Sequence, residues 1–184
     1  MKNRCDWAKE EPNISYHDNE WGKPVHDDQK LFEFLILEGA QAGLSWTTIL
    51  KRRDGYRNAF SNFNPELVSK FTQKDIKKLV NDESIIRNKL KITSAINNAI
   101  KFLQIQKEFG SFDSYLWGFV NNKPIKNTFK KLSELPASTE ISTKLSKDLK
   151  QRGFTFVGPT ICYAFMQAVG MVNDHTSDCY LFKK

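Results

Sequence analysis

The feature that most constrains the fold of this chain is a pair of potential metal ligands near each of its ends. Cys5 and His17 stand near the start of the sequence, and His175 and Cys179 stand near its end. Thiolate and imidazole are ligands that Zn²⁺ prefers, and four of them fill a tetrahedral site without leaving a position for a catalytic water. A metal ion held by all four would be structural and would tie the two ends together. Neither half has the spacing of a zinc finger, so chance placement is the alternative.

Size and composition indicate one compact unit. The chain has 184 residues, close to the size of one domain, and we expect a single domain over residues 1–184. No apolar run approaches the roughly 20 residues that span a bilayer, and no signal-peptide pattern is present, so we expect no membrane association. The 3 cysteines do not form an even secreted framework, and Cys162 lies in an apolar run typical of a core. We therefore expect a cytoplasmic protein.

The charge of the chain favours a polyanionic partner. The formal net charge is +7 and the pI is about 9.3. Basic surfaces gain affinity for phosphate backbones because binding releases condensed counterions. One cluster of basic residues contains Lys144, Lys147, Lys150 and Arg152. Part of the excess charge could be no more than a solvated surface.

Capping residues and apolar periodicity predict one helix after another. We expect helices from Asp27 or Asp28 through Glu38, from Ser45 towards Lys51, from Pro65, from Thr72 to near Val80, from Ile86 to Phe109, from Asp113 to Val120, from about Glu140 to Gln151 and from Pro159 to Val169. Polar and apolar residues nowhere alternate persistently, which argues against a sheet. The N-terminal region reads as a short irregular arm. The predicted fold class is all-α.

The segment from Gln151 to Cys162 predicts a turn between two helices that contacts DNA. A basic helix ends at Gly153, and Gly158 opens a new helix with Pro159 at its first position. Glycine lets the backbone approach another surface closely, and the free N–H groups at a helix start suit a phosphate oxygen. The pattern resembles a helix-hairpin-helix element, and an ordinary helix-loop-helix is the alternative. The residues expected to contact DNA are Lys150, Arg152, Gly153, Gly158 and Thr160.

Glu38 lies on the apolar face of its predicted helix. Leu31, Phe34, Leu35 and Glu38 fall at i, i+3, i+4 and i+7, which places a carboxyl group among core residues. Burying an unpaired carboxylate costs on the order of several kcal/mol, so Glu38 needs a partner or a function. A glutamate that turns to solvent at the helix end is the other interpretation. The neighbouring polar and aromatic residues favour a binding site; they are Gln41, Gly43, Leu44 and Trp46.

Aromatic residues surround His17 in the N-terminal arm. Trp7, Tyr16 and Trp21 stand close to it, and Trp46 follows Glu38. Such rings can stack on a flat ligand or enclose a cation. Each ring alone is more often a core residue, but we expect at least two of these four to line a pocket.

Four stretches of the sequence together resemble the 3-methyladenine DNA glycosylase I family of the helix-hairpin-helix DNA glycosylase superfamily. They are Tyr-His-Asp-Asn-Glu-Trp-Gly at 16–22, Leu-Glu-Gly-Ala-Gln-Ala-Gly-Leu-Ser-Trp at 37–46, Arg-Gly-Phe-Thr-Phe-Val-Gly-Pro-Thr at 152–160 and Gly-Met-Val-Asn-Asp-His at 170–175. The resemblance implies an all-helical fold, a structural zinc ion on Cys5, His17, His175 and Cys179, and a base pocket that contains Glu38, Tyr16 and Trp46. Family members often have a second tyrosine where this chain has Asn13, so one pocket wall differs.

The resemblance also implies a reaction on alkylated double-stranded DNA. Methylation at N3 makes adenine cationic within the nucleotide and weakens the N-glycosidic bond. We expect the enzyme, a monomer, to flip the nucleotide, bind the base in the pocket and hydrolyse this bond, leaving an abasic site. Glu38 would accept hydrogen bonds from the base and Trp46 would stack on it. Tyr16, with Trp7 or Trp21, would complete the enclosure.

Three other residues bear on the implied mechanism. Superfamily members that cut the DNA backbone use a lysine where this chain has Thr160, so we expect a monofunctional enzyme. Asp174 is the nearest candidate for the carboxylate that stabilises the sugar cation in other members, but it adjoins a predicted metal ligand and we assign it no such role. Leu44 could insert into the gap left by the flipped base, or it could be a core residue.

Two other classes of protein are compatible with the same residues. A DNA-binding module without catalysis would use the hairpin and the pocket only to sense a modified base. A zinc hydrolase would keep an open coordination position, which four protein ligands disfavour. The sequence leaves open whether 3-methylguanine is also a substrate.

Overall fold

Side-chain caps start several helices at the predicted residues. The computed structural model describes residues 2–182. In it, a carboxylate oxygen of Asp27 accepts a 2.8 Å hydrogen bond from the N–H of Lys30 at the start of α2 (Asp28–Gln41). Ser45 caps α3 (Trp46–Lys51) in the same way. Thr72 and Asp75 form a capping box at the start of α6 (Gln73–Leu79).

The other elements follow in order along the chain. They are α1 (Asn13–Asn19), α4 (Arg53–Ala59), η1 (Ser61–Phe63), α5 (Pro65–Val68), α7 (Lys89–Phe109), α8 (Phe112–Gly118), β1 (Ile125–Lys126), η2 (Leu132–Glu134), α9 (Glu140–Gln151), α10 (Pro159–Ala168) and β2 (Val172–Asn173). The fold is therefore mostly helical, as the caps and the periodicity predict. None of the helices in residues 2–182 is long and apolar enough to cross a membrane.

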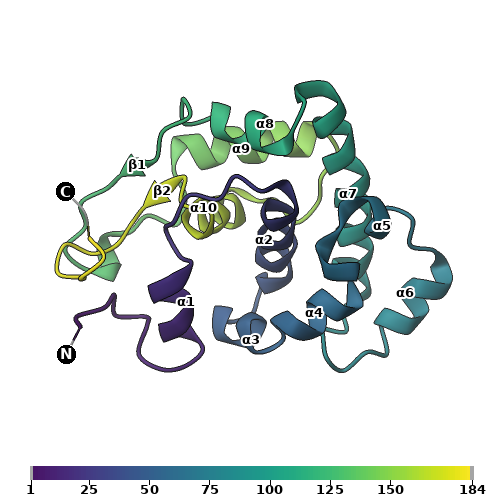
Figure 1. Cartoon of the computed structure of the whole chain (residues 1–184), viewed down its shortest axis with the longest axis horizontal. Helices are drawn as coiled ribbons and strands as arrows, with labels where there is room; N and C mark the ends of the chain where they lie inside the picture. The colour runs from purple at the N-terminus through teal and green to yellow at the C-terminus, as the bar shows by residue number, and fades with distance from the viewer. Residues whose placement is uncertain (1, 183–184) are drawn as a thin grey trace.

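Helix α2 occupies the centre of the molecule, with α10 beside it (Figure 1). Every residue from Leu31 to Ala40 is buried, so most of α2 has no face towards solvent. A helix that is enclosed on all sides must lie in a core. This position takes two carboxyl groups, those of Glu33 and Glu38, into the interior. One hydrophobic cluster extends from Cys5 to Cys179.

The two ends of the chain lie close together at the end of the molecule opposite α6 (Figure 1). The N–H of Tyr180 donates a 2.9 Å hydrogen bond to the carbonyl of Asn3. The side-chain amide of Asn3 also donates to the Asp178 carbonyl at 2.8 Å. The segments that carry the predicted metal ligands therefore meet, as their distribution along the sequence requires.

The structure differs from the predicted secondary structure at the β1–β2 pair, at α1, at α4 and at the start of α7. The all-α prediction omits a two-residue parallel pair between β1 and β2, which is too short to produce a periodic pattern. The N-terminal arm contains α1, and α4 follows α3 directly; neither has a side-chain cap to reveal its start. Helix α7 begins at Lys89 rather than Ile86, and two of its apolar residues, Leu90 and Ile100, are exposed.

Candidate active site

A cavity of about 370 Å³ lies between α1, α2, α3, α10 and the connection between α8 and α9. Its lining residues are Trp7, Asn13, Tyr16, Trp21, Glu38, Gln41, Trp46, Thr47, Leu132, Leu135, Ala164 and Gln167. The five side chains that the sequence assigns to the pocket, Trp7, Tyr16, Trp21, Glu38 and Trp46, are all among them. The fold thus brings together residues from widely separated segments. Their roles in binding remain predictions.

Glu38 is buried within this cavity wall. Its exposed fraction is 3%, and its Oε2 has no hydrogen-bond partner among the described residues. Burial raises the pKa of the Glu38 carboxyl to about 8, since a low-dielectric environment disfavours the charged form. The helix-end interpretation, in which Glu38 turns to solvent, is therefore wrong. The carboxyl group is free to bind a ligand that enters the cavity.

Aromatic rings form a continuous wall of the cavity. The ring centroids of Tyr16 and Trp46 lie 5.4 Å apart, and those of Trp7 and Trp21 lie 5.1 Å apart. Trp7 also lies 6.1 Å from Tyr16 and so connects the two pairs. Rings in such tilted or edge-on arrangements leave flat faces for a planar ligand.

Three polar atoms of the cavity wall are buried without a partner in residues 2–182. They are the Tyr16 hydroxyl, Glu38 Oε2 and Trp46 Nε1. Burial also raises the pKa of Tyr16 well above its usual value, with the Glu38 carboxyl as the next cause, so the hydroxyl keeps its proton. Two donors, the Tyr16 hydroxyl and the Trp46 N–H, and one carboxyl group therefore lack hydrogen-bond partners within residues 2–182 in one aromatic cavity. Buried polar groups are normally satisfied, so this set points to a polar, planar ligand.

Apart from Asn13, six lining residues are not assigned to the pocket by the sequence. Gln41 is one of the neighbours of Glu38 that favour a binding site, and Thr47, Ala164 and Gln167 belong to α3 and α10. Leu132 and Leu135 come from the connection between α8 and α9, whose polar sequence predicts no part in a pocket. Two leucines within a run of charged and polar residues were the available signal for this part of the wall.

Asn13 joins α1 to α3 at the edge of the cavity. Its amide nitrogen donates a 2.9 Å hydrogen bond to the hydroxyl of Thr47, which lies 3.2 Å from the Asn13 carbonyl oxygen. The residue is buried and lines the cavity. Asn13 therefore places an amide, rather than an aromatic ring, at this edge of the cavity.

Three of the four predicted metal ligands converge. The sulfur atoms of Cys5 and Cys179 and a ring nitrogen of His17 lie within 4.8 Å of one another, and all three residues are buried. His17 Nε2 is 3.4 Å from Cys179 Sγ, while its Nδ1 lies 2.9 Å from Asp18 Oδ1. A carboxylate on the second ring nitrogen is the usual arrangement behind a metal-binding histidine.

His175 lies beside this cluster rather than within it. Its ring centroid is 5.1 Å from that of His17. Its Nδ1 lies 2.8 Å from Asn173 Oδ1, whereas its Nε2 is buried and has no partner among the described residues. Two thiols, one imidazole and this nearby unpaired nitrogen fit a Cys₂His₂ site for Zn²⁺. The three cysteines of the chain are free thiols.

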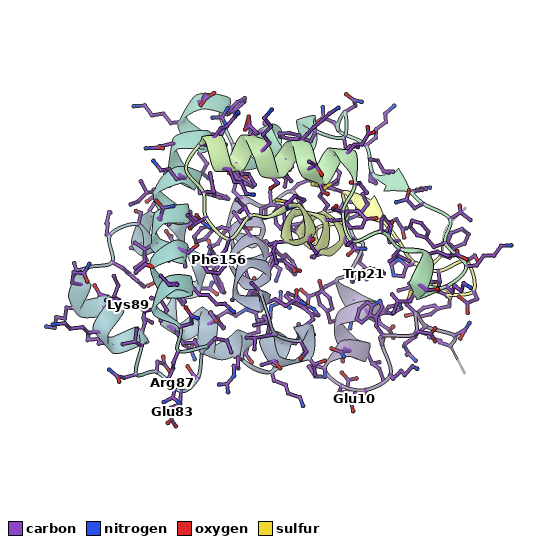
Figure 2. The ribbon with its side chains drawn as sticks, turned by 180° about the vertical axis from the view of Figure 1, so that it is seen from behind. Glu10, Trp21, Glu83, Arg87, Lys89 and Phe156 are labelled. Carbon is purple, nitrogen blue, oxygen red and sulfur yellow. The ribbon has the colours of Figure 1, made fainter. Side chains whose placement is uncertain are left out.

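The turn between α9 and α10 has the backbone that its glycines predict. Gly153 has a φ of 88°, and Gly158 caps α10 without a side-chain hydrogen bond. Figure 2 shows Phe156 in this turn, at the side of α2. A Cβ atom added at Gly39 would lie 3.4 Å from Cβ of Phe156, so the turn packs directly on the residue after Glu38.

Side chains of α7 hold this turn in place. The Asn98 amide donates to the Thr155 carbonyl at 2.9 Å, and its oxygen accepts the Thr155 N–H at 3.0 Å. Asn97 donates to the Gly153 carbonyl at 2.8 Å. Phe156 has a φ of 55°, a conformation that non-glycine residues seldom adopt. The turn is therefore a rigid element beside the cavity.

The residues of this region that are predicted to contact DNA differ in their exposure and in their ion pairs. Lys150, Gly153 and Thr160 are exposed, and Gly158 is half-buried. Arg152, in contrast, pairs with Glu108 and Asp148, each at 2.7 Å. Because its guanidinium is already engaged within the protein, the structure weakens the prediction that Arg152 binds a phosphate.

Leu44 is exposed, whereas Asp174 is buried and hydrogen-bonded. Leu44 is 39% exposed in the turn before α3, so it is not a core residue and is available for insertion into DNA. Asp174 is buried and accepts hydrogen bonds from Asn127, Tyr163 and Gln167 at 2.6–2.7 Å. The Asp174 carboxylate is therefore engaged within the protein. Cys162 is buried in the core, as predicted.

A basic helical protein with a carboxyl-bearing aromatic cavity beside a glycine-containing turn has the features of a nucleobase-binding enzyme that acts on DNA. The family model described as methyladenine glycosylase matches residues 7–183, and the chain belongs to that family, whose members are hydrolases of N-glycosyl bonds. The chain is 48% identical over 180 residues to the DNA-3-methyladenine glycosylase of Haemophilus influenzae, covering 97% of each chain.

Solved structures agree with this assignment. A crystal structure of 3-methyladenine DNA glycosylase I superposes with a TM-score of 0.96 at 46% identity and covers 98% of this chain and 100% of its own. A single-substitution variant of 3-methyladenine DNA glycosylase I, in complex with 3-methyladenine, has a TM-score of 0.95 at 38% identity and covers 99% of this chain and 98% of its own.

Proposed function

We propose that this chain removes 3-methyladenine from alkylated double-stranded DNA by flipping the nucleotide and hydrolysing its N-glycosidic bond. The observation that carries the proposal is the set of three unpaired polar atoms, on Tyr16, Glu38 and Trp46, in one aromatic cavity. Adenine alkylated at N3 is planar, has hydrogen-bonding edges and is cationic within the nucleotide. The aromatic rings of the cavity wall match its flat face, the unpaired polar atoms match its edges, and the Glu38 carboxyl group matches its charge. The related variant solved with 3-methyladenine gives independent support.

The charge of the substrate explains the selectivity. A cationic base in the cavity stabilises the Glu38 carboxylate, whose charged form is otherwise disfavoured by burial. The rings of Tyr16 and Trp46 attract the same cation through their faces. Unmodified adenine is neutral and gains neither interaction, so it is held less well.

The reaction requires little further activation, because methylation at N3 already weakens the N-glycosidic bond. The bond between C1′ of the sugar and N9 of the base breaks, and its electron pair neutralises the positive charge of the base. Water adds to C1′ and loses a proton, leaving free 3-methyladenine and an abasic site. Glu38 holds the base during this step. Thr160 occupies the position of the lysine nucleophile of strand-cleaving relatives in the superfamily, so the DNA backbone stays intact.

The rigid turn between α9 and α10 serves as the helix-hairpin-helix contact to DNA. The N–H groups at the start of α10 are not used by a side-chain cap, so they are available for a phosphate oxygen. Exposed Lys150 adds a positive charge nearby, and Leu44 fills the space left in the duplex. The protein acts as a monomer on double-stranded DNA.

A structural Zn²⁺ joins the ends of the chain. Cys5, His17 and Cys179 hold the ion, and His175 supplies the fourth ligand through its unpaired Nε2. Such an ion contributes folding free energy and takes no part in the chemistry when all its positions are filled.

The test is analysis of the bases released from duplex DNA treated with dimethyl sulfate. The wild-type protein is expected to release 3-methyladenine and to leave strands that break only after alkali treatment. Glu38→Gln is expected to slow the release at least ~10-fold, the loss that about 1.4 kcal/mol of transition-state stabilisation produces. Glu66→Gln on α5, an exposed site, is the matched control and should behave as wild type. Chromatography also records any 3-methylguanine.

Base release, measured together with DNA binding and with metal exchange, separates the two other classes of protein. A binding module would hold alkylated DNA but release no base. A zinc hydrolase would lose activity on metal exchange while remaining folded. Strand breaks without alkali treatment would contradict the monofunctional mechanism.

A further inference from the structure

We propose that the segment from Asn127 to Pro136, called the 127–136 loop below, is a second DNA-binding element that contacts the strand carrying the flipped nucleotide. The inference rests on the proposed function, since it requires a nucleotide in the cavity. The loop combines two kinds of side chain at one place. Leu132 and Leu135 line the cavity, and the exposed Lys130 and Lys131 precede them directly.

The base of the loop is fixed to β2 and to the segment that follows it. The N–H of Asn127 donates to the Asn173 carbonyl at 3.1 Å, and its side chain donates to Asp174 Oδ1 at 2.7 Å. Farther along, the N–H of Ser177 donates to the Phe129 carbonyl at 2.8 Å. These bonds hold the loop at a defined position beside the cavity, at the end of the molecule where the chain termini meet (Figure 1).

The tip of the loop is closed by its own hydrogen bonds. The N–H of Lys130 donates to Glu134 Oε2 at 2.7 Å, and the N–H of Leu135 donates to the Leu132 carbonyl at 3.1 Å. The Glu134 carboxylate is therefore engaged with the backbone. Within residues 2–182 neither Lys130 nor Lys131 belongs to an ion pair. Both ammonium groups are available to an outside anion.

Leu132 is an unusual member of the cavity wall. It is 44% exposed, whereas Tyr16 and Glu38 in the same wall are 4% and 3% exposed. An apolar side chain that is only half covered in the free protein can be buried by what enters the cavity. A flipped nucleotide presents an apolar base face and sugar to such a residue, and its flanking phosphates suit the two lysines. This combination identifies a DNA strand as the partner.

The first test is the salt dependence of DNA binding. The double variant Lys130→Gln/Lys131→Gln is compared with the double variant Lys77→Gln/Lys78→Gln. The second pair is exposed on α6, at the opposite end of the molecule (Figure 1). The probe is a duplex that contains a stable abasic-site analogue. The loop variant should lower the slope of log Kd against log salt by about 1–2, since each lost phosphate contact removes about 0.9. Equal slopes for the two double variants would overturn the inference.

The second test concerns Leu132. Leu132→Ser is expected to slow single-turnover release of 3-methyladenine about 10-fold with an unchanged salt slope, and Leu132→Met is expected to restore the rate. Leu90→Ser, at an exposed position on α7, is the control for loss of a surface leucine. A Leu132→Ser rate equal to wild type would refute the contact. Failure of the wild type to release base would instead refute the proposed function, so the two failures are distinguishable.

Discussion

The ring centroids of Tyr16 and Trp46 lie 5.4 Å apart at an interplanar angle of 54°, although the two residues belong to α1 and α3. The Asn13–Thr47 hydrogen bond joins the same two helices. Behind α1, Glu20 binds the guanidinium of Arg53 through two contacts of 2.8 Å. The aromatic wall of the cavity is thus assembled by packing α1 onto the helices that follow α2.

Replacing Tyr16 by phenylalanine removes a buried hydroxyl that has no partner in the described structure. We expect Tyr16→Phe to raise the free energy of unfolding by about 1 kcal/mol, because an unsatisfied buried polar group costs about 1–3 kcal/mol. Release of 3-methyladenine should become slower, because the base loses a partner. Calorimetry and base release on the same preparation check both effects. Tyr56→Phe is the contrast, since that hydroxyl accepts the Ile86 N–H and its loss should destabilise. Equal destabilisation by both changes would refute the ligand role of the Tyr16 hydroxyl.

The raised pKa of Glu38 has a consequence for stability. Its pKa is about 8 in the folded protein and is 4.5 for an unperturbed glutamate. The folded state therefore binds this proton more tightly than the unfolded state, and stability falls as pH rises from about 5 to about 8. Glu38→Gln lacks this titration and should gain on the order of a few kcal/mol relative to wild type across that range. Urea unfolding at pH 5.5 and 8.5 measures the difference. If wild type and variant show the same pH dependence, Glu38 is not a buried acid with a raised pKa.

Metal removal is expected to act on folding. The protein as isolated should contain about one zinc ion per chain, and a strong chelator should lower its melting temperature by more than ~10 °C, because structural zinc contributes folding free energy directly. Cys179→Ser should lose the metal. Cys162→Ala, a buried cysteine outside the cluster, should retain it. Metal analysis that finds full zinc in Cys179→Ser would contradict the proposed ligand set.

Asn98 holds the α9–α10 turn through its hydrogen bonds to Thr155, so a change there tests DNA binding separately from base binding. Asn98→Ala removes both hydrogen bonds to Thr155. We expect affinity for duplex DNA to fall about 10-fold, the equivalent of one hydrogen bond of about 1.4 kcal/mol, with unchanged affinity for free 3-methyladenine. Asn81→Ala, an exposed site after α6, is the control. Parallel losses of both affinities would show that Asn98 supports the fold in general.

Much of this architecture is predictable because its signals are local. Asp27, Ser45 and Thr72 cap the helices that follow them, and the inward position of Glu38 follows from its spacing to Leu31 and Phe34. A different, long-range signal is the placement of Cys5 and His17 near one end of the sequence and of His175 and Cys179 near the other, which predicts that the two ends meet.

The remaining features depend on contacts between distant segments. Helix α1 has no side-chain cap, so its start carries no local signal. Leu132 and Leu135 reach the cavity from a loop that Asn127 and Phe129 fix to β2 and to the segment after it. The ion pairs of Arg152 with Glu108 and Asp148 likewise require α7 and α9 to be adjacent.

The most direct measurement is calorimetric titration of free 3-methyladenine into the wild-type protein, Glu38→Gln and the Glu66→Gln control. We predict one base bound per chain by wild type and control, with at least ~10-fold weaker binding by Glu38→Gln, since that factor corresponds to one hydrogen bond of about 1.4 kcal/mol. No binding by folded wild-type protein, or equal binding by Glu38→Gln, would contradict the assignment of this cavity as the base site.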